Sequence, residues 1–154
     1  MNATQFKALC DAAASTVDAE ASEANGRYSF AVDHVEIVLA LDDPDDAGAI
    51  SCYLDLGDTS RCDRAQVCEQ LLELNLRNHG TRTGSYAFDI GSGRAIFCGH
   101  LLNADVLDGE YVADMLRLFV EQTDPARRMV ANPAACTGST SEEARNDLFI
   151  SGLA

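Results

Sequence analysis

The stretch that decides the fold runs from Arg61 to His100: RCDRAQVCEQLLELNLRNHGTRTGSYAFDIGSGRAIFCGH. Its first half predicts a helix whose apolar side chains, at about 100° per residue, cover roughly 200° of the helix surface. These side chains are Val67, Cys68, Leu71, Leu72, Leu74 and Leu76. A surface helix needs an apolar stripe of only about 100°. We therefore expect this helix to pack on a sheet along one side and on another surface along the other. A second copy of the chain is the simplest candidate for that surface.

The second half of the stretch predicts a β-hairpin. Residues 85–90 and 94–100 alternate aromatic and aliphatic with small or polar side chains on either side of Gly91-Ser92-Gly93. Alternation with a period of two around a glycine-rich turn is typical of a hairpin. A glycine loop that cradles phosphate opens a helix, whereas this one joins two strands. The loop therefore does not indicate a nucleotide site.

Toward the N-terminus the pattern predicts one helix and three strands. Residues 3–19 form a helix with Phe6, Leu9, Cys10, Ala13 and Val17 on one face. After Asn25-Gly26 the apolar period becomes two, which predicts strands over 28–32, 35–41 and 50–56. The acidic residues 42–48, with their Pro and Gly, are expected to form a solvated turn.

Toward the C-terminus we expect one more helix and then a tail. The helix begins near Asn103 or Asp105, and Pro125 should end it. From Ala131 the residues are small and polar, which cannot bury enough surface to offset chain entropy. The prediction is a single domain at 1–130, a flexible tail at 131–154, and the order α-β-β-β-α-β-β-α. This order is typical of an α+β fold with a twisted antiparallel sheet.

The charge balance narrows the choice of partners. The chain has 11 Lys and Arg against 25 Asp and Glu, a net charge of −14. Nucleic acids and anionic membrane surfaces are both bound through Lys and Arg, so neither is expected as a partner. We find no secretory signal and no apolar run long enough to span a bilayer. The six cysteines are scattered through apolar patterns, which favours reduced thiols in the cytoplasm.

Residues that could carry chemistry are few. Structural zinc requires two closely spaced pairs of ligands, which the sequence lacks, so no metal is expected and no cofactor either. Cys98 and His100 could supply a thiolate and an imidazole, and a small thiol-dependent enzyme is therefore one alternative. Each cysteine before the tail also fits an apolar face, where it acts as a small hydrophobe. We predict no catalytic residues and no enzyme.

The order and spacing of these elements resemble a known family, the class I chaperones of bacterial type III secretion, or Tir-chaperone-like family. The resemblance covers about 125 residues and rests on patterns of small and apolar residues. They are Tyr28-Ser29-Phe30-Ala31-Val32-Asp33, Val35-Glu36-Ile37-Val38-Leu39, Tyr53-Leu54-Asp55-Leu56-Gly57, Leu71-Leu72-Glu73-Leu74-Asn75-Leu76, the hairpin after Gly84, and Leu107-Asp108-Gly109-Glu110. The longer tail and the acidic turn depart from the family pattern.

The resemblance implies a function without catalysis. A homodimer would bind the N-terminal, non-globular segment of a secreted effector protein in the bacterial cytoplasm and keep it soluble and competent for secretion. The expected effector contacts are Phe6, Leu9, Tyr28, Phe30, Ile37 and Leu39, and the expected dimer contacts are Leu71, Leu74, Tyr86 and Phe88. The alternative within the same fold is an adaptor module that binds some other protein.

Overall fold

The computed structural model describes residues 1–42, 48–80 and 84–132. Their elements are α1 (Ala3–Thr16), β1 (Ser22–Ala24), β2 (Arg27–Val32), β3 (Val35–Leu41), β4 (Ala49–Asp58), α2 (Arg64–Asn78), β5 (Gly84–Asp89), β6 (Arg94–Leu102), the short 3-10 helix η1 (Ala104–Val106) and α3 (Gly109–Ala131). The predicted α+β fold and the order of its helices and main strands are confirmed. The predictions for the acidic turn and the tail concern residues 43–47 and 133–154, which lie outside the described residues.

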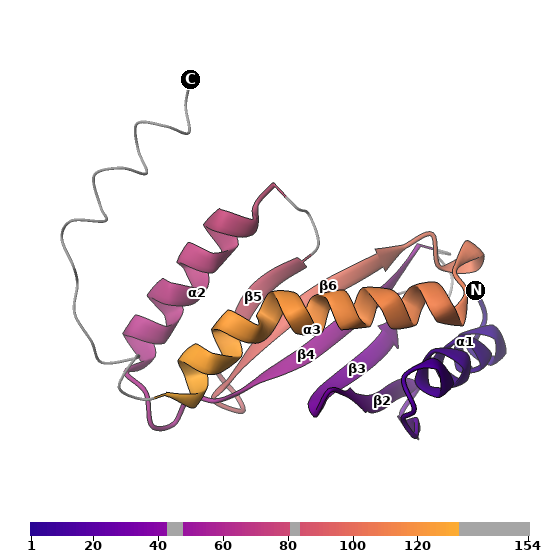
Figure 1. The fold of residues 1–154 in the computed structure, drawn as a ribbon, viewed down its shortest axis with the longest axis horizontal. Helices are drawn as coiled ribbons and strands as arrows, with labels where there is room; N and C mark the ends of the chain where they lie inside the picture. Colours follow the sequence, from indigo (N-terminus) through magenta and orange to yellow (C-terminus); the bar gives the residue numbers. More distant parts are fainter. Residues whose placement is uncertain (43–47, 81–83, 133–154) are drawn as a thin grey trace.

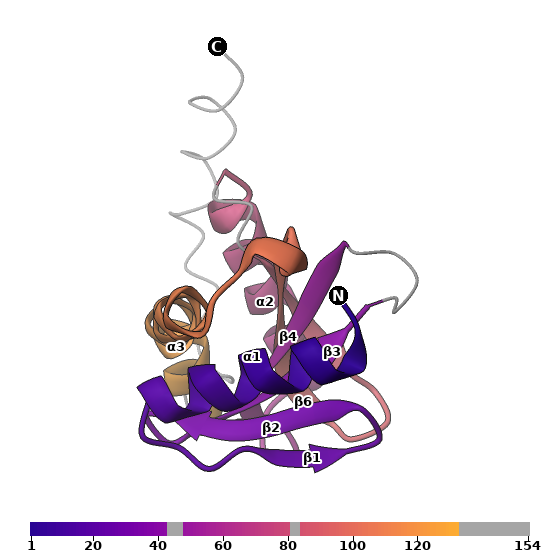
Figure 2. The same ribbon diagram turned by 90° about the vertical axis from the view of Figure 1, so that its right-hand side faces the viewer.

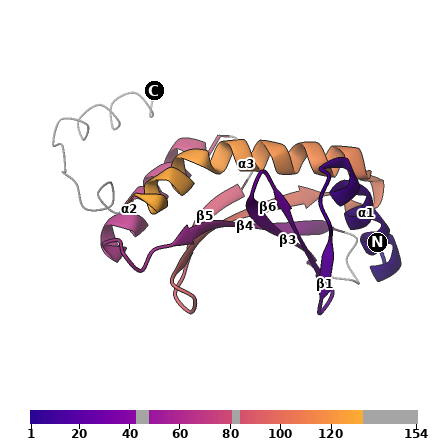
Figure 3. The ribbon, with the colours of Figure 1, turned by 60° about the horizontal axis from the view of Figure 1, so that its bottom comes forward.

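The six strands form one antiparallel sheet in the order β1-β2-β3-β4-β6-β5. The helices lie on one side of this sheet (Figure 3). α3 runs along the middle of the sheet, α2 lies beside β5, and α1 lies beside β2 (Figures 1 and 2). The opposite side, which we call the open face, presents Glu36, Val38, Tyr53 and Ile96. Strands β1 and β5 are therefore the two edges of the sheet.

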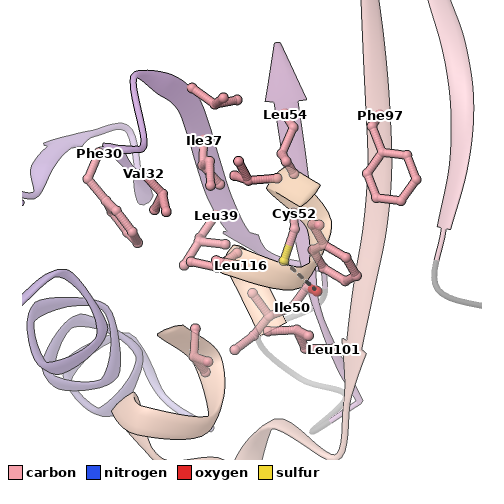
Figure 4. Packing of buried hydrophobic residues seen from close by; sticks show 14 of the residues in the cluster. Phe30, Val32, Ile37, Leu39, Ile50, Cys52, Leu54, Phe97, Leu101 and Leu116 are labelled. Carbon is pink, nitrogen blue, oxygen red and sulfur yellow. Dashed lines mark hydrogen bonds between the residues drawn. The ribbon is translucent and has the colours of Figure 1, made fainter. Parts of the chain in front are cut away.

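The core lies between the sheet and the helices. Alternate residues of the strands point inward, as the period of two predicts. Those at most 4% exposed include Tyr28, Phe30, Val32, Ile37, Leu39, Ile50, Cys52, Leu54, Phe97 and Leu101. Leu116 of α3 lies among the side chains of β3 and β4 (Figure 4).

Strand β1 is an element that the sequence patterns above did not predict. It pairs with β2 through the two-residue turn Asn25-Gly26, in which both residues have positive φ, 55° and 73°. Positive φ at both central positions is the type I′ turn of a tight hairpin, for which Asn-Gly is the preferred sequence. The Asn-Gly pair was thus the available signal for this strand.

Helix α3 is longer than predicted. Pro125 was expected to end it, but the helix continues to Ala131, so that prediction was wrong. Proline removes the hydrogen bond to the carbonyl four residues earlier, here that of Glu121. Both residues are exposed, so water can take the place of the missing N–H. The helix begins at the cap residue Asp108, whose carboxylate accepts from the Tyr111 N–H, rather than at Asn103 or Asp105.

Candidate functional site

The six residues predicted to contact an effector lie together, but inside the protein. Phe6, Leu9, Tyr28, Phe30, Ile37 and Leu39 are each at most 8% exposed and belong to the core between α1, β2 and β3. The rings of Phe6 and Tyr28 pack edge to face, with centroids 5.3 Å apart. A partner could reach this cluster only if α1 moved. Contact between these side chains and an effector stays a prediction.

The exposed surface beside this cluster was not found from the sequence. A hollow of about 370 Å³ lies between the end of α1 and the approach to β1. Ala14, Ala19 and Ala21 are among its lining residues, and Asp11, Asp18 and Glu20 place exposed carboxylates around it. Small side chains leave room for an incoming apolar group, and the carboxylates favour a neighbouring basic one.

The β1 edge of the sheet, next to this hollow, is open. β1 is the last strand on its side, and its three residues are exposed. Ala24 and Arg27 flank the two-residue turn and form its closing hydrogen-bonded pair, so the ladder alternates and Glu23 pairs with Tyr28 without backbone bonds. The N–H and C=O of Glu23 therefore point outward. This backbone is available to a strand from another chain.

At Tyr86 the β5 edge is covered by a side chain of α2. The Asn75 Oδ1 accepts from the Tyr86 N–H at 2.7 Å, and the Asn75 Nδ2 donates to the Tyr86 carbonyl at 2.9 Å. One amide thus takes both backbone groups that an added strand would use at Tyr86. The Tyr86 hydroxyl also donates to the Gln122 carbonyl at 3.0 Å, which ties this edge to α3. The β1 edge therefore offers the backbone of Glu23 to an added strand, whereas the β5 edge does not offer that of Tyr86.

Helix α2 instead presents an apolar stripe to solvent. Leu72 and Leu76 are 67% and 64% exposed, and Ala65 and Cys68 continue the same side of the helix. We call these four residues the α2 stripe. Of the predicted dimer residues, Leu71 and Tyr86 are buried within the chain, whereas Leu74 and Phe88 are half-buried. Their place in a dimer stays a prediction.

Of the described thiols, those of Cys10 and Cys98 do not have the surroundings of a nucleophile. A reactive cysteine needs a lowered pKa. Burial instead raises the pKa of Cys98, and it raises the pKa of Cys10 to about 12. The His100 side chain lies on the face of β6 that points away from the core. Its Nδ1 is 3.3 Å from the Ser51 hydroxyl and 3.6 Å from a carboxylate oxygen of Asp42.

The Ser51, His100 and Asp42 cluster does not form a relay either. The hydroxyl of Ser51 donates to the carboxylate of Asp42, and one imidazole nitrogen faces both partners. A hydrolytic triad uses the two nitrogens separately, one for the hydroxyl and one for the carboxylate. Within residues 1–42, 48–80 and 84–132 there is also no group of three His, Cys, Asp or Glu side chains placed to hold a metal ion.

None of the helices in the described part of the chain is long and apolar enough to cross a bilayer. Three surface features of the described residues can bind another molecule: the β1 edge with its hollow, the α2 stripe and the open face.

Comparison with known proteins agrees with this architecture. The crystal structure of the ExsC–ExsE complex contains a chain with a TM-score of 0.68 and 17% identity, over 84% of this chain and 97% of that one. The structure of the HopA1–SchA chaperone–effector complex gives a TM-score of 0.63 and 16% identity, over 82% and 95%. At such identities the likeness shows the fold alone. A search of curated proteins finds no match by sequence.

The profile of the Tir chaperone protein (CesT) family matches residues 12–127. The match spans the sheet and most of the helices, and it confirms the resemblance found in the sequence. The chain belongs to the Tir chaperone protein family.

Proposed function

We propose that this protein is a homodimeric chaperone of the bacterial cytoplasm, with residues 1–130 as its chaperone domain. It binds the N-terminal, non-globular segment of a type III secreted effector and keeps that protein soluble and competent for secretion. Membership of the Tir chaperone family supports this role, and so do the two structural neighbours, whose structures are an ExsC–ExsE complex and a chaperone–effector complex. The role requires binding and no catalysis.

The single observation that carries the proposal is the open β1 edge beside the hollow. A segment that adds a strand outside β1 gains backbone hydrogen bonds at Glu23, and alternate side chains of that segment point to opposite faces of the sheet. One set would enter the hollow lined by Ala14, Ala19 and Ala21. Ordering an extended segment costs several kcal/mol, so further contacts beside α1 must contribute.

The α2 stripe supports the dimer. Leu72 and Leu76 are large, apolar and more than 60% exposed, although the opposite side of α2 packs in the core. In a two-fold dimer both copies use the same patch, so each leucine position contributes two buried side chains, one from each copy. The wide apolar arc of this helix has a simple explanation in that arrangement.

The test is affinity purification of the tagged chain from its native cell, followed by mass spectrometry and limited proteolysis of the bound protein. Glu23→Pro removes the outward N–H of β1, whereas the matched variant Glu23→Ala loses the same side chain and keeps that N–H. We expect wild type and Glu23→Ala to retain a secreted protein protected only in its N-terminal region, and Glu23→Pro to lose it.

Recovery of intracellular proteins through folded domains would support the adaptor alternative instead. Equal binding by Glu23→Pro and Glu23→Ala would rule out strand addition at β1.

A further inference from the structure

The open face of the sheet carries a groove of about 440 Å³, which we call the open-face groove. Its lining includes Glu36, Val38, Tyr53, Asp55, Arg94 and Ile96. The apolar members are half-buried, and the helices all lie on the other side of the sheet (Figure 3). The groove is thus an apolar surface that the described part of the chain leaves uncovered.

The charged residues around the groove leave an excess of negative charge. Arg94 is paired with Asp55, with the Nε 2.8 Å from a carboxylate oxygen. Among the described residues Glu36 is in no ion pair, and it is exposed. An occupant that combines large apolar side chains with one cation would therefore match the groove.

Helix α3 ends at the same end of the sheet as the groove. A Cβ at Gly57 of β4 would lie 3.0 Å from the Val130 Cγ1, and the Cys62 thiol donates to the Val130 carbonyl at 3.7 Å. Next to Gly57, Asp58 pairs in register with Arg94, which lines the groove. The chain that follows Asn132 therefore starts at this end of the sheet, on its helix side, and a segment that docks in the groove must pass around the end of β4.

The sequence that follows contains a segment of matching chemistry. Within residues 133–154, Arg145 is the only cation, and Leu148, Phe149 and Ile150 are the only run of three large apolar residues. Asp147 lies between them, so residues 145–150 are neutral overall and the match to Glu36 rests on Arg145 alone. The twelve residues 133–144 span up to about 40 Å. Neighbouring strands are about 4.8 Å apart, so the groove is about 10 Å wide from β3 to β6. An extended chain spans about 13 Å from Arg145 to Phe149, which is close to this width.

We propose that residues 145–150 of this chain dock in the open-face groove, with Arg145 beside Glu36 and the apolar side chains of 148–150 over Val38, Tyr53 and Ile96. A segment tethered to the same chain binds at a high effective concentration, so even a small contact area is occupied. The proposal goes beyond the chaperone function and does not rest on it, because it concerns the chain without a partner.

Cleavage by trypsin after Arg145 tests the proposal directly, because this is the only tryptic site in residues 133–154. The appearance of the 146–154 fragment is followed by mass spectrometry for the full chain and for a synthetic 133–154 peptide. A docked site is cut only when it opens, so we expect the chain to be cut at least about tenfold more slowly than the peptide. The rate should not change on tenfold dilution of the chain.

Two substitutions with matched controls locate the docking. Ile96→Ser in the groove should raise the rate toward that of the peptide, whereas Val106→Ser, at an 81% exposed site on η1, should not. Phe149→Ser should have the same effect as Ile96→Ser, and Leu153→Ser should have none.

Cleavage of wild type at the peptide rate would overturn the proposal. Slow cleavage that Ile96→Ser and Phe149→Ser leave unchanged would overturn it as well. Protection that disappears on dilution would assign the groove to a second copy instead.

Discussion

The two edges of the sheet differ in whether their outward backbone N–H and C=O groups have a hydrogen-bond partner. At β5, the amide of Asn75 takes both the N–H and the C=O of Tyr86, and α2 turns Leu72 and Leu76 outward. At β1, the backbone of Glu23 faces solvent, and the nearby helix α1 keeps its large side chains inside. At Tyr86 the β5 edge is closed to an added strand, and the helix beside it presents an apolar surface. At Glu23 the β1 edge is open, and the surface beside it is polar. This difference suits two kinds of partner: a side-chain interface at α2 and a backbone interface at β1.

The first way to sharpen this comparison is Phe6→Ala. Phe6 is 2% exposed and packs on the Tyr28 ring, so its loss leaves a cavity under α1. We expect the free energy of unfolding to fall by about 3–5 kcal/mol. Phe88→Ala, at the half-buried position on the other edge, should have a clearly smaller effect. Chemical denaturation measures both. Unchanged stability of Phe6→Ala would mean that Phe6 serves a partner rather than the core.

The second is Leu72→Asp, which places a charge on the α2 stripe. Burial of a leucine contributes about 1.5–3 kcal/mol, and a two-fold interface uses it twice. We expect the dimer to weaken by at least about 3 kcal/mol, more than 100-fold in Kd. Sedimentation should then show the 16.5 kDa monomer. The control Leu118→Asp, at a 45% exposed position on α3, should remain dimeric. A monomeric wild-type chain would contradict the α2 stripe as the interface.

Much of the fold could be predicted from the sequence because each strand buries alternate residues. Phe30 and Val32, or Ile37 and Leu39, fall on one face by the period alone, and the inward face then follows from which side is apolar. Strand β1 was missed because its residues, Ser22 to Ala24, are all exposed and carry no apolar alternation. Only the Asn25-Gly26 turn encodes it.

The binding surfaces were harder to predict, and the leucines of α2 show why. The wide apolar arc indicated two packing sides, but Leu71 and Leu72 differ by only about 100° on the helix. Which of them faces the core depends on the rotation of α2, and the contacts between Asn75 and Tyr86 help to fix that rotation. Such contacts join residues eleven apart across two elements. Periodicity within one helix carries no information about them.

The third way to test the comparison is to open the closed edge. Asn75→Leu leaves the N–H and C=O of Tyr86 without their side-chain partner. An unsatisfied buried backbone group costs about 1–3 kcal/mol, and we expect the stability to fall by that amount. Asn75→Asp keeps an acceptor for the Tyr86 N–H and should lose less. Thermal denaturation of both variants measures the order of their stabilities. A stability of Asn75→Leu equal to wild type would show that β5 needs no cover.

The smallest expected effect uses cysteines to report on the two edges. Cys10, on the inner face of α1, is buried, and desolvation raises its pKa to about 12, while Cys68 lies on the α2 stripe. A thiol with a raised pKa stays protonated in the folded chain after the unfolded chain ionises, near pH 8.5. The unfolded state then binds fewer protons, so the free energy of unfolding decreases as pH rises from about 8.5 toward 12.

Above pH 9.5 the contribution of Cys10 to this decrease approaches about 1.4 kcal/mol per pH unit. Cys10→Ala should remove that contribution and so make the decrease smaller, although the buried Cys52, whose pKa desolvation also raises, keeps its own contribution. Cys68→Ala, which keeps Cys10, should retain the contribution of Cys10. Denaturation curves at pH 8, 9 and 10 measure the difference between the variants. If Cys10→Ala keeps the wild-type slope, the thiol under α1 is already in contact with water. The β1 side would then be as accessible as the α2 stripe, and the contrast between the two edges would rest on their backbone alone.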